Sequence, residues 1–236
     1  MGARYKPILE SALNRLGVEV LSCPDNIRLS EKVRGHADLS IVHLGSSKLV
    51  IDWVLAKSSP LFVNNLTNRG LDLFHTIHNN AVTGAKEYSL CSCLAGKNFI
   101  HKIKDSDKTV LTNIDKCTNI INVRQGYSKC SVCVVDDNSI ITSDPGIAKA
   151  AKAGGISLLE IAPGHIKLKG YDYGFIGGSA FKISQSQLAF TGHIKLHPDC
   201  CRIEKYLQNK NIEPVYLTDK PIFDIGSAIP LREYSD

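Results

Sequence analysis

Short runs of β-forming residues occur along the chain in pairs, and a few small or polar residues separate the members of each pair. Gly45-Ser46-Ser47 and Asp136-Asp137-Asn138 have the residue types of hairpin turns. The pattern therefore predicts three β-hairpins, formed by Leu39–Leu44 with Lys48–Ile51, Ser89–Leu94 with Asn98–Lys102, and Cys130–Val135 with Ser139–Thr142.

Five segments of the chain resemble one another, each mixing small residues with β-formers. They begin at Asp38, Tyr88, Tyr127, Tyr173 and Phe223. Their spacing is about 40 to 50 residues, which lies within the range of repeat architectures. The spacing predicts a chain built from similar modules.

Helices with recognisable ends are expected between some hairpins and a returning strand. Asp144-Pro145 provides an N-cap and a first helical proline, and Gly154-Gly155 ends that helix before a strand at Ile156–Ile161. In the next module, Pro198-Asp199 opens a helix that precedes a strand at Pro214–Leu217. The first of these modules thus follows a ββαβ order, and the second supplies its αβ part.

The N-terminal region has the helix and strand of a module but no hairpin before them. We expect a helix at Ile8–Leu16, ended by Gly17, and a strand at Val18–Leu21; a further helix is placed at Leu71–Asn80. Conversely, the last repeated segment, at Phe223, has no helix after it. A ring in which the N-terminus completes the last module would join the two and remove exposed strand edges.

This arrangement, with Gly177-Gly178 and other small residues on the inner strands, resembles the penteins, a superfamily of guanidino-group-modifying enzymes. It includes arginine and agmatine deiminases, dimethylarginine hydrolases and amidinotransferases, and the chain is most similar to a bacterial branch. The resemblance covers nearly the whole chain. It implies an α/β fold, a five-bladed α/β propeller, with residues 1–236 forming a single domain that the N-terminal helix and strand close.

The resemblance also implies a chemistry whose residues are only partly present. Family members attack the guanidinium carbon with a cysteine near the C-terminus, while a histidine moves protons and carboxylates hold the nitrogens. Here Ala228 stands where the thiol would be, and Ser179 replaces the carboxylate of the Gly-Gly-Asp-like motif. The resemblance therefore implies the fold without the usual cysteine mechanism, as in a pseudoenzyme.

Charge and composition narrow the classes of partner. The chain has 28 basic and 23 acidic residues, a net charge of +5, and the basic residues are scattered rather than clustered as on a nucleic-acid-binding surface. The apolar stretch Leu39–Val63 is interrupted by Lys48, Asp52 and Lys57, and no signal peptide is evident. We expect a cytoplasmic protein that binds neither nucleic acid nor membrane. Glycine-rich nucleotide motifs are lacking, so no cofactor is expected.

The eight cysteines are expected to be reduced and mostly buried. Cys130-x-x-Cys133 has metal-ligand spacing, but its valine-rich neighbours favour a strand, in which residues three apart point to opposite faces. Cys91 and Cys93 share a face of a strand, and two thiols make only half a site. Core packing is favoured in both cases, and no metal site is assigned.

A second group of reactive side chains follows Gly192. If this segment is extended, His193 and His197 lie on one face, where they can bind a metal or one can move protons. Cys200 and Cys201 stand at a helix N-terminus, which lowers a thiol's pKa. In the alternative interpretation this is a surface loop, and Asp199 is simply the N-cap. His193 is the candidate catalytic residue.

The candidate ligand-binding residues are those that a ring of modules brings to its axis. They are His36, Asp38, Tyr127, Ser179, Asp224 and Ser227. Carboxylates at Asp38 and Asp224 would favour a cation, while glycines such as Gly178 and Gly226 would keep the channel open. In the alternative interpretation Asp38 caps a turn and Tyr127 packs in the core.

Three functions remain in view. The first is binding of a small polar, guanidino or amino compound in a central channel without a cysteine nucleophile. The second is a hydrolase-like enzyme that acts on a guanidino or amide substrate with His193 as the proton shuttle. The third is a metal-binding protein.

Overall fold

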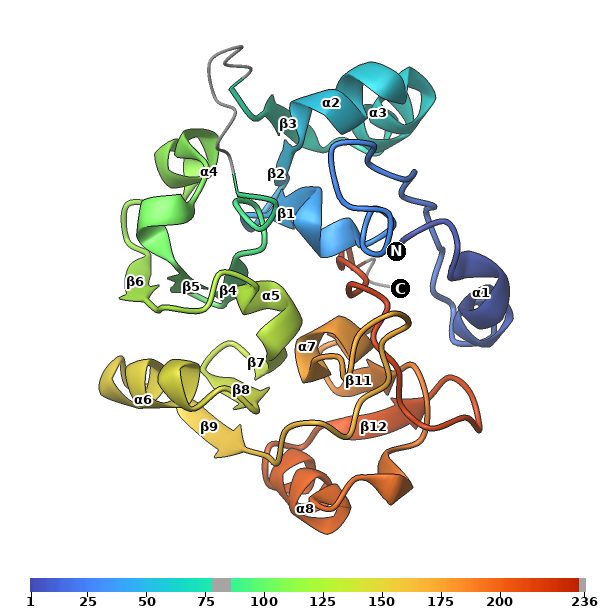
Figure 1. Cartoon of the computed structure of the whole chain (residues 1–236), viewed down its shortest axis with the longest axis vertical. Helices are drawn as coiled ribbons and strands as arrows, with labels where there is room; N and C mark the ends of the chain where they lie inside the picture. Colours follow the sequence, from blue (N-terminus) through green and yellow to red (C-terminus); the bar gives the residue numbers. More distant parts are fainter. Residues whose placement is uncertain (78–85, 234–236) are drawn as a thin grey trace.

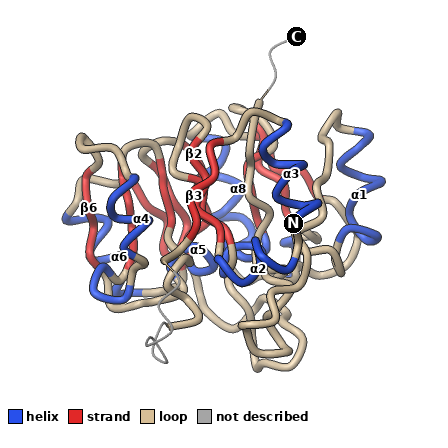
Figure 2. The backbone as a smooth tube through the Cα atoms, turned by 90° about the horizontal axis from the view of Figure 1, so that it is seen from above, coloured by secondary structure: helices blue, strands red, loops and turns tan. Residues whose placement is uncertain are grey.

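The computed structural model describes residues 1–77 and 86–233. Within these ranges the strands form four three-stranded sheets, and each sheet is a hairpin with a third strand parallel to its second strand. Viewed down the short axis of the molecule, the sheets follow one another around the centre in chain order (Figure 1). Many of the strands run along that short axis (Figure 2).

In each of the first two sheets, helices connect the second strand to the third. The first contains β1 (Ile41–His43), β2 (Lys48–Ile51) and β3 (Asp72–His75), with α2 (Trp53–Ser58) and α3 (Pro60–Asn68) between β2 and β3. The second contains β4 (Cys93–Ala95), β5 (Asn98–His101) and β6 (Asn119–Asn122), with η2 (Ile103–Asp105) and α4 (Lys108–Asn113) between β5 and β6. Each is a ββαβ unit, and all three predicted hairpins are confirmed.

The third and fourth sheets repeat this order, and each is preceded by a short helix. The third unit contains α5 (Ser128–Ser131), β7 (Val132–Asp136), β8 (Ser139–Thr142), α6 (Pro145–Ala153) and β9 (Ser157–Glu160). The fourth contains α7 (Ile176–Ser179), β10 (Ala180–Lys182), β11 (Gln187–Phe190), η3 (Ile194–Leu196), α8 (Cys200–Asn209) and β12 (Glu213–Tyr216). The helix expected after Asp144 is confirmed as α6, and the Asp144 side chain caps it by accepting a hydrogen bond from the backbone N–H of Ile147.

A buried serine marks the same place in all five repeated segments. Ser40, Ser92, Ser131 and Ser179 each stand immediately before the first strand of their unit, and Ser227 is the corresponding residue of the last segment. The serine carbonyl also has a recurring role. It accepts a hydrogen bond from Asp52 N in the first unit (2.8 Å) and from Thr191 N in the fourth (3.0 Å). The segments are therefore structural repeats.

The fifth segment is not a complete sheet. In the part of the chain that the structure describes, isolated bridges join Gly2 to Cys23 and Lys167 to Phe223, but no named strand lies in this region. The chain has an α/β fold of repeated units, and a fifth blade is not established. Around this region α1 (Lys6–Arg15) buries Leu9 and Leu13 against a cluster that includes Ile225 and Ala228.

Two local predictions were wrong. Residues 18–21 form no strand, because they pair with no neighbouring strand. The helix placed at Leu71–Asn80 is instead the strand β3 from Asp72 to His75, where pairing with β2 outweighs the helical pattern; residues 78–80 lie outside the described ranges. The 3-10 helix η1 (Ala37–Leu39) precedes β1. No helix among residues 1–77 and 86–233 is long and apolar enough to cross a membrane.

Candidate functional site

The central pocket is a cavity of about 300 Å³ to which residues in or beside all five repeated segments contribute. Aromatic rings form much of its wall, and carboxylates and other titratable groups are set among them. The aromatic residues are Tyr127, Tyr171, Tyr173 and Phe175; the titratable groups include His36, Glu87, Cys130, Asp172 and Asp224. A largely apolar cavity with a few converging polar groups is the usual form of a small-molecule site.

Asp224 is the buried carboxylate of this pocket. Its Oδ1 accepts a hydrogen bond from the backbone N–H of Gly226 (2.8 Å), and its Oδ2 accepts one from Phe175 N (2.9 Å). Burial raises the pKa of Asp224 to about 6; His36 lowers it and Asp38 raises it by smaller amounts. Asp224 is thus ionised at neutral pH but poorly solvated, so a cation that reached it would be stabilised.

Glycines allow the side chains of the site to approach the backbone closely. A Cβ on Gly178 would lie 2.0 Å from Asp224 Oδ1, and a Cβ on Gly226, whose φ is +67°, would lie 2.2 Å from His36 Cγ. We expected these glycines to keep a channel open. Instead, Asp224 and His36 occupy the space that the absent side chains leave. Gly177 packs on the backbone carbonyls of Lys129 and Val132.

A buried cluster of Asp38, Cys91 and Cys130 lies at one side of the pocket, and Cys130 forms part of the pocket wall. The thiol of Cys130 donates to Asp38 Oδ2 (2.9 Å), and its sulfur lies 3.6 Å from the sulfur of Cys91. The Cys91 contact, together with burial, raises the pKa of Cys130 well above its usual value. Asp38 is fully buried and, unlike His36 and Cys130, does not line the pocket. Its carboxylate accepts from a thiol rather than from a turn N–H, which does not match the role of a turn cap.

The remaining predicted ligand-binding residues, Tyr127, Ser227 and Ser179, each form a hydrogen bond through the side chain. Tyr127 lines the pocket and donates its hydroxyl to Glu87 Oε1 (2.5 Å). Ser227 is buried, and its Oγ accepts from Lys129 Nζ (2.9 Å). Ser179 is also buried, but its hydroxyl donates to the carbonyl of Ile176 within α7 and does not reach the pocket.

His193 is not brought into the central pocket. Its ring stacks on Tyr216 with a centroid distance of 4.0 Å, and its Nδ1 accepts from Lys195 N. The extended segment that we expected between His193 and His197 is the 3-10 helix η3, so the period-2 argument for a shared face does not apply. The ring of His197 is instead in edge contact with His165.

The cysteines at the start of α8 differ from the expectation of an activated thiol. Burial and the nearby Glu204 raise the pKa of Cys200 rather than lowering it. Asp199 stands at the N-cap position but makes no side-chain capping bond. Its carboxylate accepts from Ala162 N (2.6 Å) and pairs with Arg202. This group therefore connects α8 to the end of β9.

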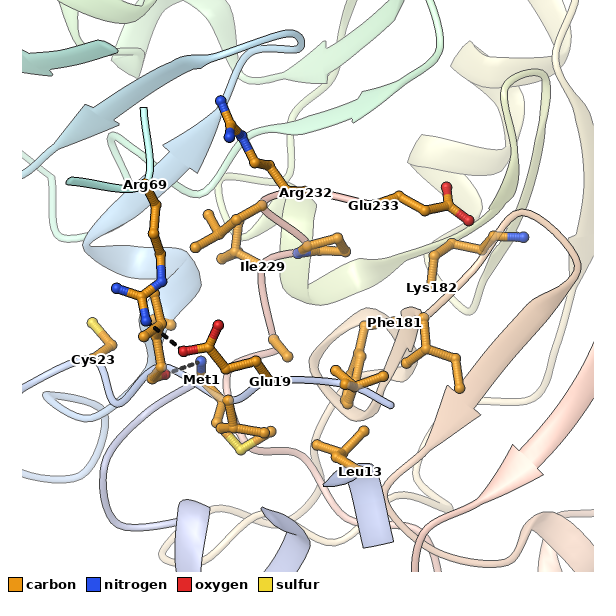
Figure 3. Close-up of a pocket in the computed structure, with 18 of the residues that line it drawn as sticks. Met1, Leu13, Glu19, Cys23, Arg69, Phe181, Lys182, Ile229, Arg232 and Glu233 are labelled. Carbon is orange, nitrogen blue, oxygen red and sulfur yellow. Dashed lines mark hydrogen bonds and ion pairs between the residues drawn. The ribbon is translucent and has the colours of Figure 1, made fainter. Parts of the chain in front are cut away.

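A second cavity, of about 580 Å³, lies where the two ends of the chain meet, and we call it the terminal cavity. Its apolar wall includes Leu13, Phe181 and Ile229, and charged side chains such as Arg232 and Glu233 stand at its margin (Figure 3). Glu19 and Arg69 form an ion pair across part of it. The side-chain charges of this cavity are therefore largely at the surface.

Comparison with known proteins places the chain in a family. A family model described as "Family of unknown function (DUF6873)" matches residues 1–229. The chain belongs to this family. No match was found among curated proteins.

Two solved structures similar to this DUF6873 chain share its fold. DDAH from Pseudomonas aeruginosa, a mutant complexed with citrulline, has a TM-score of 0.53 at 9% identity, covering 90% of this chain and 82% of that one. C. jejuni agmatine deiminase has a TM-score of 0.51 at 15% identity, covering 91% and 78%. The pentein-like fold expected from the repeats is confirmed.

Cys91 and Cys130 were assigned to core packing, and their meeting at the axis was missed. A signal for it exists in the sequence. When the repeated segments are aligned on their buried serines, the preceding residues are Leu39, Cys91, Cys130, Gly178 and Gly226. Equivalent positions of a ring converge, so this alignment would have placed both thiols beside the glycines of the pocket.

Proposed function

We propose that this protein binds a small compound with a guanidino or amino group in the central pocket, without a C-terminal cysteine nucleophile. The observation that carries the proposal is the buried carboxylate of Asp224. Among the described residues its hydrogen bonds come from two backbone N–H groups, and no side-chain cation forms an ion pair with it. Each oxygen retains capacity for a donor from a planar cation.

The wall of the pocket supports the same ligand class. The faces of aromatic rings attract cations, and this attraction strengthens when water is excluded. Tyr127, Tyr173 and Phe175 line the cavity together with Asp224, and Glu87 adds a second carboxylate. A planar cation of modest size satisfies both the rings and the carboxylates. The two similar solved structures suggest compounds to test: citrulline is bound in the first, and agmatine is named in the second.

The site favours binding over the hydrolase-like alternative. His193, the proposed proton shuttle, contacts Tyr216 and does not line the pocket. The thiol that does line it, Cys130, has a raised pKa and donates a hydrogen bond to Asp38, so it keeps its proton and is not a thiolate nucleophile at neutral pH. Ala228 lies in an apolar cluster with Leu9 and Leu13.

Calorimetric titration of agmatine into the metal-free protein tests the proposal. We expect saturable binding of about one equivalent. The variant Asp224→Asn should bind about 10- to 100-fold more weakly, because a hydrogen bond to a charged group contributes about 1.5–3 kcal/mol. The matched control Glu19→Gln, which removes a carboxylate from the terminal cavity, should bind as the wild type does.

Two results would contradict the proposal. The first is equal agmatine affinity in wild type and Asp224→Asn. The second is no binding of agmatine, citrulline or any other guanidino or amino compound in a panel. A parallel assay for released ammonia separates binding from turnover, and steady turnover would support the hydrolase-like alternative instead.

A further inference from the structure

Four side chains of types that can bind a metal ion, from three units, meet at the wall of the central pocket. His36 and Asp38 come from the segment that leads into β1, Cys91 precedes β4, and Cys130 lies in α5. A ring nitrogen of His36, a carboxylate oxygen of Asp38 and the sulfur of Cys130 all lie within 4.8 Å of one another. Cys91 Sγ lies 3.6 Å from Cys130 Sγ. All four residues are at least 97% buried.

The separation of the sulfurs matches a tetrahedral site. Zinc–sulfur bonds are about 2.3 Å, so two thiolates on one tetrahedral zinc ion lie roughly 3.8 Å apart. The observed 3.6 Å is close to that edge. The other two ligands are near, because a ring nitrogen of His36 and a carboxylate oxygen of Asp38 each lie within 4.8 Å of the Cys130 sulfur.

Two buried polar atoms of this group lack hydrogen-bond partners. Within the described part of the chain, Nε2 of His36 and Oδ1 of Asp38 are buried and unpaired. A buried polar atom without a partner is costly, and coordination to a metal ion is one of the ordinary ways in which such an atom is satisfied. The two atoms belong to residues that already contribute to the same cluster.

We propose that His36, Asp38, Cys91 and Cys130 bind one divalent metal ion of the zinc type. Thiolate and imidazole ligands together favour zinc over magnesium or calcium, which prefer oxygen ligands. This site is distinct from the Cys130-x-x-Cys133 spacing considered above, because Cys133 packs in a different apolar cluster, with Ile141 and Phe190. Its ligands are far apart in sequence and are assembled by the ring.

The proton and charge balance is compatible with cation binding in the pocket. The thiols of Cys91 and Cys130 lose their protons to the solvent as two metal–sulfur bonds form, and no electrons are transferred. Release of two protons balances the two positive charges of the ion, so metal binding leaves the net charge of the cluster unchanged. His36 and Cys130 line the pocket, which gives the ion a path to the site.

Titration of the chelator-treated, reduced protein with Co²⁺ tests the metal site in the absence of any guanidino compound. We expect thiolate-to-cobalt charge-transfer bands and tetrahedral visible bands that saturate near one equivalent and disappear when Zn²⁺ displaces the cobalt. Zinc binding should release about two protons, measured by calorimetry in buffers of different ionisation enthalpy. Absence of the charge-transfer bands would overturn the proposal.

Variants assign the ligands. Loss of an outer partner of a metal ligand already weakens binding about 10- to 100-fold, so Cys91→Ser and Cys130→Ser should each weaken cobalt binding by at least about 100-fold. The control Cys200→Ser/Cys201→Ser removes a thiol pair outside the site and should leave the affinity unchanged. The opposite pattern, in which only the control loses binding, would contradict the assignment.

X-ray absorption on zinc-loaded wild type does not depend on variants that fold poorly. It should show two sulfur ligands at about 2.3 Å and two nitrogen or oxygen ligands at about 2.0–2.1 Å. A shell of four sulfurs, or none, would overturn the proposal. Because the agmatine titration uses metal-free protein, failure of this site leaves the proposed ligand pocket standing, and the reverse also holds.

Discussion

The two cavities of this molecule differ in the burial of their charged and titratable side chains more than in volume. The terminal cavity is the larger, about 580 Å³ against about 300 Å³ for the central pocket. Its side-chain charges, such as the Glu19–Arg69 pair, are largely at the surface and screened by solvent. The smaller pocket holds Asp224, His36 and Cys130, all buried. Burial of titratable groups, rather than cavity volume, therefore distinguishes the central pocket from the terminal cavity.

The difference has a cause in the repeats. Corresponding residues of all the units converge at the axis, where glycines let Asp224 and His36 approach the backbone. The terminal cavity lies instead where the ends of the chain meet, and in the described residues no three-stranded sheet fills that place. Aliphatic residues such as Leu13 and Ile229 cover it loosely. The first region brings buried titratable groups together, whereas the second lies between aliphatic side chains and charges at the surface.

Gly178→Ala should have the largest effect on stability. The added methyl would lie 2.0 Å from Asp224 Oδ1, so the site must rearrange, at a cost of about 3 kcal/mol in the free energy of unfolding. The matched control is Gly17→Ala at the terminal cavity, where nothing lies within 4 Å and only the positive φ of +74° is unfavourable, about 1 kcal/mol. Urea denaturation measures both. Similar losses for the two variants would remove the claimed difference in packing.

The second effect is a stability change with pH that depends on Asp224. Its pKa of about 6 in the folded protein exceeds the value of about 3.9 in an unfolded chain. As pH falls from about 6 to about 4, the folded state takes up a proton at Asp224 while the unfolded chain remains ionised there. The resulting contribution to the free energy of unfolding is fully present below about pH 4 and is lost as pH rises through 6. Relative to Asp224→Asn, metal-free wild type should gain about 2–3 kcal/mol on going from pH 7 to pH 4.

Parallel pH profiles of unfolding free energy for wild type and Asp224→Asn would contradict this expectation. Glu19→Gln serves as the control, because its profile should remain parallel to that of the wild type.

The third effect concerns the ligand. Binding of a cation requires ionised Asp224, and with a pKa of about 6 only about one-tenth of the free protein is ionised there at pH 5. Agmatine affinity of the metal-free protein should therefore fall about tenfold between pH 7.5 and pH 5. A flat profile across this range would mean that another group binds the cation.

The smallest effect is expected for removal of a charge at the terminal cavity. Glu19 is well exposed and pairs with Arg69 at the surface, so Glu19→Gln should change the free energy of unfolding by less than about 1 kcal/mol. Raising the salt concentration should reduce the difference further. A larger loss, insensitive to salt, would show that this cavity depends on its charges more than the account allows.

Elements with local signals were predictable from the sequence. Asp144 and Gly154 set the ends of α6 through contacts within a few residues, and Asp136-Asp137-Asn138 turns the third hairpin. The strand β3 was not predictable in this way, because it depends on pairing with β2. Pairing of that kind is tertiary and overrides local preference.

The site was only partly predictable for the same reason. His36, Asp38, Tyr127 and Asp224 were selected as axial residues and do lie together, since the spacing of the repeats is visible in the sequence. The contact between Cys91 and Cys130 joins different units and needs the alignment of the five serines. His193 was misplaced because the local turn into η3 carries no strong sequence signal.

A crystal structure of the protein with agmatine or a similar guanidino compound tests the central claim most directly, because it compares the two cavities in one experiment. The account predicts density for the guanidinium group between the aromatic rings of the central pocket, with nitrogens within hydrogen-bond distance of the Asp224 carboxylate. Ligand density confined to the terminal cavity, beside Glu19 or Glu233, with the central pocket unchanged, would contradict it.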